Sequence, residues 1–328
     1  GYKSIKTPSQ LEDVIDSECK AQGVKYLFID EIQNVKGFES VIEAYREEEE
    51  YSIFITGSNS YLLSGELTTQ LTGRYIAFEL FTLTFDEYLG MKRFYGQDVS
   101  SNLVKELDSY ILEGGFPKAL EYSSLKDKRR YVDSVVKEIF EKDIKKRVQV
   151  RNKDTFDKMR TFLINNFGST FSIASMLREL VKQGINVKRE TLKRYIDILL
   201  DAKILYECRR FDLKSRKSIQ GEEKFYLADL SFYFTSNVDN RINYGPVLEN
   251  IVYQYMRSKD YEVSVGRIGN LECDFLIRSP EMEYSYVQVA MTIMNDEKTE
   301  DREYRSLETI RDNYPKYVLT RDDLIQHR

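Results

Sequence analysis

The stretch that decides the fold of the N-terminal part reads KYLFIDE and covers residues 25–31. Its apolar run ends in Asp30 and Glu31, which is typical of a buried parallel strand whose carboxyl end carries an acidic pair into a crevice. Apolar residues with helical spacing follow between residues 38 and 45, and a second strand-like run, YSIFIT, covers residues 51–56. Strand, helix and strand at this spacing predict one βαβ unit.

The residues that end these two strands form the candidate site, because open α/β sheets bind ligands at the carboxyl ends of their strands. In a P-loop ATPase the first acid holds Mg²⁺ through water, the second polarises the attacking water, and a polar residue after the neighbouring strand senses the γ-phosphate. We assign Asp30 to the metal, Glu31 to the water, and Ser58 or Asn59 to the sensor position. An isolated acidic pair is equally typical of a buried strand that exits into a turn. The second strand, with its exit TGSNS at residues 56–60, favours the ATPase.

Three longer phrases extend the pattern: YLFIDEIQNVKGFE at residues 26–39, SIFITGSNSYLL at 52–63 and LTGRYIAFELFTLTFDEYL at 71–89. On these phrases the chain resembles the bacterial and archaeal AAA+-like ATPases that carry a C-terminal restriction-endonuclease-like domain. The resemblance runs over most of the chain and implies ATP and Mg²⁺ as cofactors. It also implies that Arg74 contacts a phosphate, or the site of a neighbouring subunit in a homo-oligomer. A loop arginine in solvent or in an ion pair is the alternative.

The phosphate-binding loop of these ATPases is missing. That loop needs G-x-x-x-x-G-K-[ST], whose backbone N–H groups and lysine hold the phosphates, and no glycine in the 328 residues is followed by lysine. The resembled family places the loop upstream of Gly1. We therefore expect this chain to be a fragment that binds ATP weakly at best and does not hydrolyse it.

The composition restricts the chemistry. The chain is 41% hydrophobic and 31% charged, which is typical of a soluble protein of two or three domains at this length. The single histidine, His327, excludes Ser-His and Cys-His triads, and the three distant cysteines do not indicate a disulfide framework. No stretch is long and apolar enough to cross a bilayer. We expect a cytoplasmic protein that makes no membrane contact.

The predicted fold class is α/β, in four segments. They are a partial P-loop domain with a parallel sheet (1–90), a helical connector (91–154), a winged helix-turn-helix (155–237) and an α/β restriction-endonuclease-like domain (238–328).

The winged-helix prediction comes from three helical patterns followed by two strands, joined by a basic loop, LKSRKSIQGEEK. Residues 155–217 contain 14 Lys/Arg against 7 Asp/Glu, a local charge of +7 in a chain of net charge −5. Lys188, Arg189, Lys193 and Arg194 occupy the first turns of the third helix, where a DNA reader contacts the duplex. DNA is therefore one candidate partner. A winged helix that packs against protein is the other interpretation.

The C-terminal segment shows the order helix, three strands, helix and strand of the PD-(D/E)xK nuclease core. Glu249, Asp274 and Gln288 correspond to its metal-binding positions, and Ala290 stands at the position of its lysine. Because an amide is a much poorer Mg²⁺ ligand than a carboxylate and alanine cannot stabilise a developing charge, we interpret this as a degenerate site kept as a scaffold.

The leading hypothesis is an ATPase-family protein whose nucleotide state is read out by the winged helix and the nuclease-like domain. The alternative is a nucleic-acid-binding protein with vestigial ATPase and nuclease domains. An active nuclease ranks last.

Overall fold

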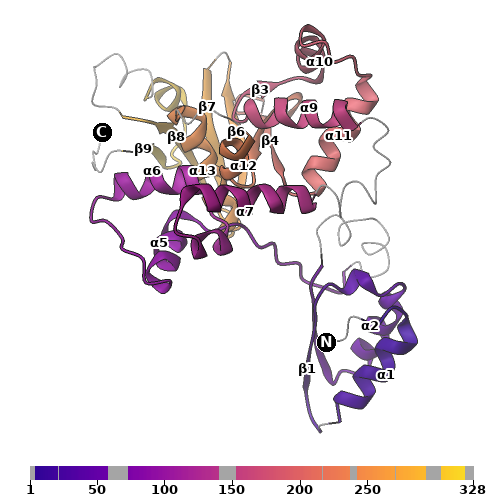
Figure 1. Cartoon of the computed structure of the whole chain (residues 1–328). Coiled ribbons are helices and arrows are strands. Elements are labelled where there is room, and N and C mark those ends of the chain that lie inside the picture. Colours follow the sequence, from indigo (N-terminus) through magenta and orange to yellow (C-terminus); the bar gives the residue numbers. More distant parts are fainter. Residues whose placement is uncertain are drawn as a thin grey trace. The chain divides into compact units, whose positions relative to one another are not determined.

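The structure is a computed structural model, and contacts divide the chain into two compact units, residues 1–79 and 80–328 (Figure 1). Among the described helices, none has the length and apolar character of a membrane span. The residues that the structure describes are 4–20, 22–57, 73–139, 153–215, 217–236, 242–269, 271–292 and 304–321.

The first unit contains the predicted βαβ arrangement. β1 and β2 pair in parallel, from Lys25 opposite Tyr51 to Ile29 opposite Ile55. The elements are α1 (Pro8–Glu18), β1 (Lys25–Ile29), the 3₁₀ turn η1 (Ile32–Asn34), α2 (Phe38–Glu47) and β2 (Tyr51–Ile55). The predicted strand, helix and strand are therefore confirmed.

One face of this parallel pair is covered by helices. Alternate strand residues point to that face and pack against apolar side chains of α1 and α2. They are Leu27, Ile29, Ile53 and Ile55. On the opposite face Tyr26 and Phe28 are 67% and 72% exposed, and Phe28 stacks on Phe54. The described residues of this unit thus leave one face of the strand pair open.

The second unit is built on one seven-stranded sheet of order β3-β5-β4-β6-β7-β8-β9. β6, β7 and β8 form an antiparallel meander, and β9 pairs in parallel with β8. The strands are β3 (Thr170–Phe171), β4 (Leu205–Asp212), β5 (Lys217–Leu227), β6 (Glu262–Ile268), β7 (Leu271–Arg278), β8 (Tyr284–Ala290) and β9 (Lys316–Thr320).

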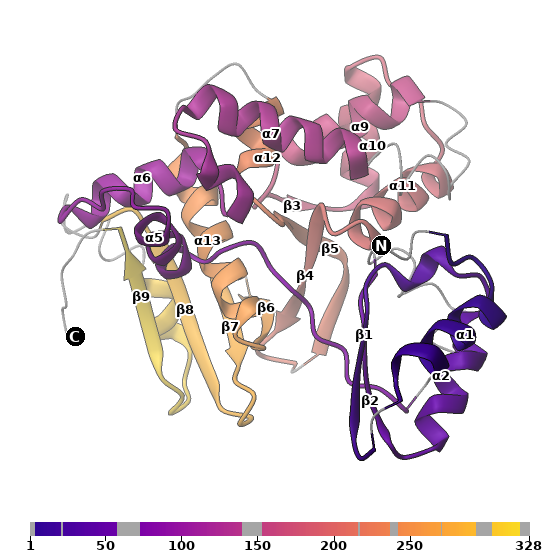
Figure 2. The ribbon, with the colours of Figure 1, turned by 60° about the horizontal axis from the view of Figure 1, so that its bottom comes forward.

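Helices cover this sheet. Figure 2 shows α13 lying along one face, where Leu248 and Tyr253 pack on Phe275 and its neighbours. The helices and turns are α5 (Phe85–Phe94), α6 (Leu103–Glu113), η2 (Pro117–Glu121), α7 (Leu125–Glu138), α9 (Lys153–Asn165), α10 (Ile173–Lys182), α11 (Arg189–Asp201), α12 (Ser231–Ser236) and α13 (Tyr244–Ser258).

Residues 153–227 follow the predicted order of three helices and a hairpin. α10 begins at Ile173 because Ser172 caps it, its hydroxyl accepting the N–H of Ser175 at 3.1 Å. The basic loop predicted between the two strands is wrong in its extent, since β5 begins at Lys217 and pairs there with Asp212 of β4. Cross-strand pairing outweighs the low strand propensity of this charged segment.

The sheet is continuous across the boundary predicted at residues 237/238. β4 pairs in parallel with β6, from Arg210 opposite Val265 to Asp212 opposite Arg267. The hairpin of the predicted winged helix and the C-terminal strands therefore belong to one sheet. The limits at 90/91 and 154/155 stay predictions.

A buried carboxylate joins distant segments of the second unit. Asp229 is 1% exposed; it accepts the N–H of Gly115 at 2.8 Å and that of Ser231 at 2.9 Å. Burial raises the pKa of Asp229, and its hydrogen bonds from Ser231 and Gly115 oppose that shift. The turn after α6 is thereby fixed against the turn that follows β5.

Candidate functional site

The first candidate site lies at the carboxyl ends of β1 and β2. Asp30 and Glu31 follow β1 directly, and Thr56 follows β2. The Thr56 hydroxyl donates a hydrogen bond to the Asp30 carboxylate and accepts the N–H of Glu31 at 3.1 Å. Since β1 and β2 pair in register, Thr56 is held beside the acidic pair by the sheet itself. One side chain thus fixes both acids at this edge.

Glu31 adopts a backbone conformation that is uncommon for its residue type. Its φ is +54°, in the left-handed region that favours glycine. Such residues cluster at functional sites, where the surrounding structure holds them. The Gln33 side chain donates a hydrogen bond to the Glu31 carboxylate. This conformation turns Glu31 out of the strand at the position predicted for the water-polarising acid.

Both carboxylates are accessible to a cation. Asp30 and Glu31 are exposed, and neither forms an ion pair with a lysine or arginine in the described part of the chain. Carboxylate oxygens are the ligands that Mg²⁺ prefers, and Mg²⁺ sites in proteins commonly keep several waters. The arrangement therefore fits a water-bridged Mg²⁺ ion.

The remaining residues predicted for this site have different outcomes. Ser58 and Asn59 lie outside the described residues. Arg74 forms an ion pair with Glu43 of α2, and both side chains are exposed, which is the ion-pair alternative named from the sequence. Sequence reasoning missed Thr56 and Gln33; the signal for Thr56 was its place as the first polar residue after the second apolar run.

The predicted nucleic-acid residues gather on α11. Lys188 precedes its first turn, Arg189, Lys193 and Arg194 follow, and all four are exposed. None forms an ion pair within the described part of the chain. The opposite face of the helix is buried, with Leu192 and Leu199 fully enclosed. These four exposed cations at the start of α11 form its basic face, which also includes the exposed Glu190.

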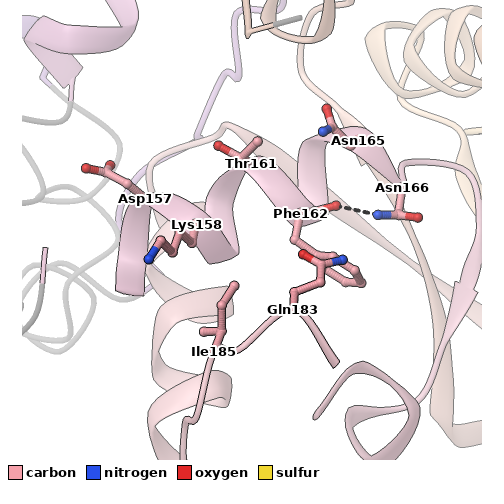
Figure 3. Close-up of a pocket in the computed structure, with 8 residues that line it drawn as sticks. All are labelled: Asp157, Lys158, Thr161, Phe162, Asn165, Asn166, Gln183 and Ile185. Atoms are coloured by element: carbon pink, nitrogen blue, oxygen red, sulfur yellow. Dashed lines mark hydrogen bonds between the residues drawn. The ribbon is translucent and has the colours of Figure 1, made fainter. Parts of the chain in front are cut away.

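A cavity of about 470 Å³ lies between α9 and the turn after α10 (Figure 3). Thr161, Asn165 and Gln183 give it a polar lining, and Asn166 donates to the carbonyl of Phe162 at 2.8 Å. The charged residues on its rim are already paired, Lys158 with Asp154 at 2.7 Å and Asp157 with Arg160. No residue predicted from the sequence to be functional lines this cavity.

The predicted degenerate nuclease residues meet around a lysine that sequence reasoning did not single out. Lys224 of β5 is 5% exposed. Its ammonium lies 3.0 Å from the Glu249 carboxylate of α13 and 2.8 Å from the Glu272 carboxylate of β7. Arg210 of β4 lies 2.7 Å from the other Glu272 oxygen, and the Tyr226 hydroxyl donates to Glu249 at 2.9 Å.

Asp274 and Gln288 are joined to each other in this cluster. The amide oxygen of Gln288 accepts the N–H of Asp274 at 3.3 Å, and the Asp274 carboxylate accepts the N–H of Val289 at 2.8 Å. Ala290 is buried. In the described part of the chain, no group of three or more His, Cys, Asp or Glu side chains is arranged to hold a metal ion.

The charges of the cluster shift two pKa values. Burial and the Glu249 carboxylate raise the pKa of Asp274 from 3.8 to about 7, and Lys224 opposes that shift. For Lys224, burial acts to lower the pKa, but the attraction of Glu249, Glu272 and Asp274 outweighs burial and raises it. Lys224 is therefore charged throughout the ordinary pH range.

Replacing Asp274 by asparagine is expected to make unfolding stability less sensitive to pH. Because the folded pKa of about 7 lies above the ordinary value of 3.8, the Asp274 contribution is greatest below pH 4 and is lost as pH rises towards 7. Between pH 5 and pH 8 the wild type should lose about 1–3 kcal/mol more than Asp274→Asn. Urea unfolding at both pH values measures this, with the exposed Asp98→Asn as control, and an equal loss in wild type and Asp274→Asn would contradict it.

Comparisons with known proteins bear on the first site. A family profile described as "AAA domain" matches residues 3–89. A second, "Domain of unknown function (DUF8612)", matches residues 104–240. The Walker-type ATPase PABY2304 of Pyrococcus abyssi matches with a TM-score of 0.44 and 15% identity, over 70% of this chain and 66% of that one.

Two relatives match nearly the whole chain. An "Uncharacterized protein" of Haemophilus influenzae is 30% identical over 321 residues, which cover 97% of this chain and 78% of the relative. "Uncharacterized protein MJ1544" of Methanocaldococcus jannaschii is 28% identical over 96% of this chain and 72% of its own length. The chain therefore belongs to the family of the Haemophilus influenzae protein, and its AAA domain makes it a P-loop ATPase-like protein.

Proposed function

We propose that the protein binds ATP with Mg²⁺ and hydrolyses it at a site whose acidic half is the edge formed by β1 and β2. Asp30 would hold Mg²⁺ through water, and Glu31 would polarise the water that attacks the γ-phosphate. The observation that supports this is Thr56, which hydrogen-bonds to the Asp30 carboxylate and to the Glu31 N–H.

The chemistry of each residue suits its proposed role. Bound Mg²⁺ neutralises charge on the phosphate oxygens. The Asp30 carboxylate is exposed and forms no ion pair in the described part of the chain, so besides the hydrogen bond from Thr56 it can accept hydrogen bonds from metal-bound water. Two hydrogen bonds hold Glu31 in place. Its backbone N–H donates to the Thr56 hydroxyl, and the Gln33 side chain donates to its carboxylate. Release of the Gln33 contact would free the carboxylate to accept a proton.

The proposal places the phosphate-binding loop outside these 328 residues, because none of their glycines is followed by lysine. Without the loop, the 328 residues alone should bind ATP weakly and show no turnover.

Arg74 belongs to the same proposal. To contact a phosphate, or the site of a second subunit, its guanidinium must leave Glu43, and that pair is exposed and therefore weak. If Arg74 contacts the site of a second subunit, the proposal includes a homo-oligomer. If Arg74 contacts a phosphate in its own subunit, the proposal does not require one. We also propose that the protein acts in the cytoplasm. The proposed use of ATP supports this, and so do the buried thiols of Cys208 and Cys273, which form no disulfide.

ATP turnover by the complete gene product tests the proposal. The wild type should release phosphate from ATP in a Mg²⁺-dependent reaction, and Asp30→Asn should lose at least about 10²-fold in kcat/KM. Lys25→Met, at the other end of β1, serves as control. Mg²⁺-dependent turnover that is equal in wild type and Asp30→Asn would overturn the proposal.

We propose nucleic-acid binding as a second function. Its support is the basic face of α11, Lys188, Arg189, Lys193 and Arg194, within an order of three helices and a hairpin that is the winged-helix order. The helix, three strands, helix and strand at residues 244–320 have the order of the nuclease core and are proposed as its degenerate scaffold.

Changing the four basic residues of α11 to glutamate should abolish duplex DNA binding. Four lost phosphate contacts correspond to a fall of about 3–4 in the slope of log K against log salt. Fluorescence anisotropy of a labelled duplex at 50 and 200 mM salt measures this. The control is Lys158→Glu with Lys182→Glu, because both lysines are already paired within their own helices. Unchanged affinity in the fourfold variant would remove this function from α11.

A further inference from the structure

The Lys224 cluster contains carboxylates from two separate elements that converge on one ammonium group. Glu249 comes from α13 and Glu272 from β7, and Lys224 reaches both from β5, at 3.0 and 2.8 Å. The Lys224 side chain is 6% exposed. A charge removed from water to this extent is stable only when it is paired and hydrogen-bonded.

The numbers of acidic and basic groups in the cluster indicate the role of Lys224. Its acids are Glu249, Glu272 and Asp274, and its cations are Lys224 and Arg210. Arg210 contacts Glu272, at 2.7 Å. Lys224 is the cation that contacts Glu249 and Glu272 and that attracts Asp274. Without it, Arg210 would be the remaining cation among the residues named for this cluster.

We propose that the Lys224 ammonium is the built-in cation of this cluster and takes the place that a divalent metal ion would otherwise occupy between Glu249 and Glu272. The cluster is thus closed to metals in the native protein, and removal of the ammonium opens a site for Mg²⁺ or Mn²⁺. Glu249 and Glu272, the two carboxylates that the ammonium contacts, are its ligands.

The distances support this exchange of one cation for another. Carboxylate oxygens lie 2.8 and 3.0 Å from the lysine nitrogen, and about 2.0–2.1 Å from a bound Mg²⁺ ion. Small side-chain movements therefore convert one arrangement into the other. In the described part of the chain no group of three or more His, Cys, Asp or Glu side chains is arranged to hold a metal ion, which agrees with an ammonium group at the centre of this cluster.

Mn²⁺ binding followed by electron paramagnetic resonance tests the proposal. Every protein carries Asp30→Asn, which removes the other candidate metal site. Lys224→Met should bind one Mn²⁺ per chain at least about tenfold more tightly than its Lys224 parent, because a charge-rich ligand set is left without its cation. Added Mg²⁺ should compete. Lys224→Arg keeps the charge and should gain nothing, and Lys182→Met, at an exposed lysine, is the matched control.

The ligands are tested by a second change. Lys224→Met combined with Glu249→Gln should lose the gained Mn²⁺ site. In the Lys224 parent, any residual Mn²⁺ binding should be the same with and without Asp274→Asn. If the Lys224 parent binds Mn²⁺ and loses this binding on Asp274→Asn, the native cluster already binds a metal ion, and the proposal is overturned.

Folding of the variant is part of the test, since removing one partner of a buried ion pair destabilises proteins by about 3–5 kcal/mol. The proposal expects millimolar Mn²⁺ or Mg²⁺ to raise the melting temperature of Lys224→Met and to leave that of the parent unchanged. A folded variant that binds no Mn²⁺, or one that stays unfolded with saturating Mn²⁺, would contradict it.

Discussion

Glu31→Gln is expected to reduce the kcat of ATP hydrolysis by the complete gene product about 10²–10⁴-fold, the usual contribution of a positioned general base. Glutamine keeps the size of the side chain and can still contact Gln33, but it cannot accept a proton from the attacking water. The Glu31 N–H remains hydrogen-bonded to Thr56, so the backbone of the site is unaffected. ATP affinity should therefore stay within about threefold of the wild type, because a group that acts only in the transition state does not change ground-state binding.

Glu49→Gln is the matched control for this experiment. Glu49 is also an exposed glutamate with positive φ in the first unit, but it lies in the turn before β2. Its replacement should leave turnover unchanged. Phosphate release and the binding of a fluorescent ATP analogue give kcat and affinity separately. Equal kcat values for the wild type and Glu31→Gln would remove Glu31 from the mechanism.

Gly114→Ala is expected to destabilise the second unit by about 2–6 kcal/mol. Gly114 ends α6 with φ +79° and ψ −175°, a conformation that costs other residues about 1–3 kcal/mol. A Cβ there would also lie 2.1 Å from the Asp229 carboxylate oxygen and 2.7 Å from Ser231 Cβ. Asp229 cannot move away without losing its buried hydrogen bond from Gly115, so overpacking adds about 1–3 kcal/mol.

The measurement is thermal or urea unfolding of the 328-residue chain, in which a loss of 3 kcal/mol corresponds to roughly 6–12 °C. Gly90→Ala is the control, because Gly90 lies within α5 with nothing within 4 Å of an added Cβ. It should be neutral or stabilising by about 0.5–1 kcal/mol. A Gly114→Ala protein as stable as the wild type would refute the close packing of this turn.

Local sequence patterns predicted those helices and strands whose residues alone indicate the element. β1 and β2, for example, were predicted from their apolar runs. The helix α1 was missed although its signal is present: Thr7 and Gln10 form a capping box and Pro8 occupies the first turn. In a short helix of mixed polarity, that signal is easily overlooked.

The candidate sites were predictable only in part, because their partners are distant in sequence. The acidic pair was found from its place after an apolar strand, but the role of Thr56 depends on the register between β1 and β2. Glu249 and Asp274 were named from element order. Lys224 could not be, since its neighbours come from α13 and β7 and only the folded sheet brings them to it.

Hydrogen exchange of the complete gene product, with and without Mg²⁺ and a slowly hydrolysed ATP analogue, tests the central claim most directly. A nucleotide held at the carboxyl ends of β1 and β2 should slow exchange in peptides that cover residues 29–34 and 55–57. Protection of residues 29–34 that disappears in Asp30→Asn would agree with the nucleotide site described here. Nucleotide binding that leaves both strand ends unprotected would contradict it.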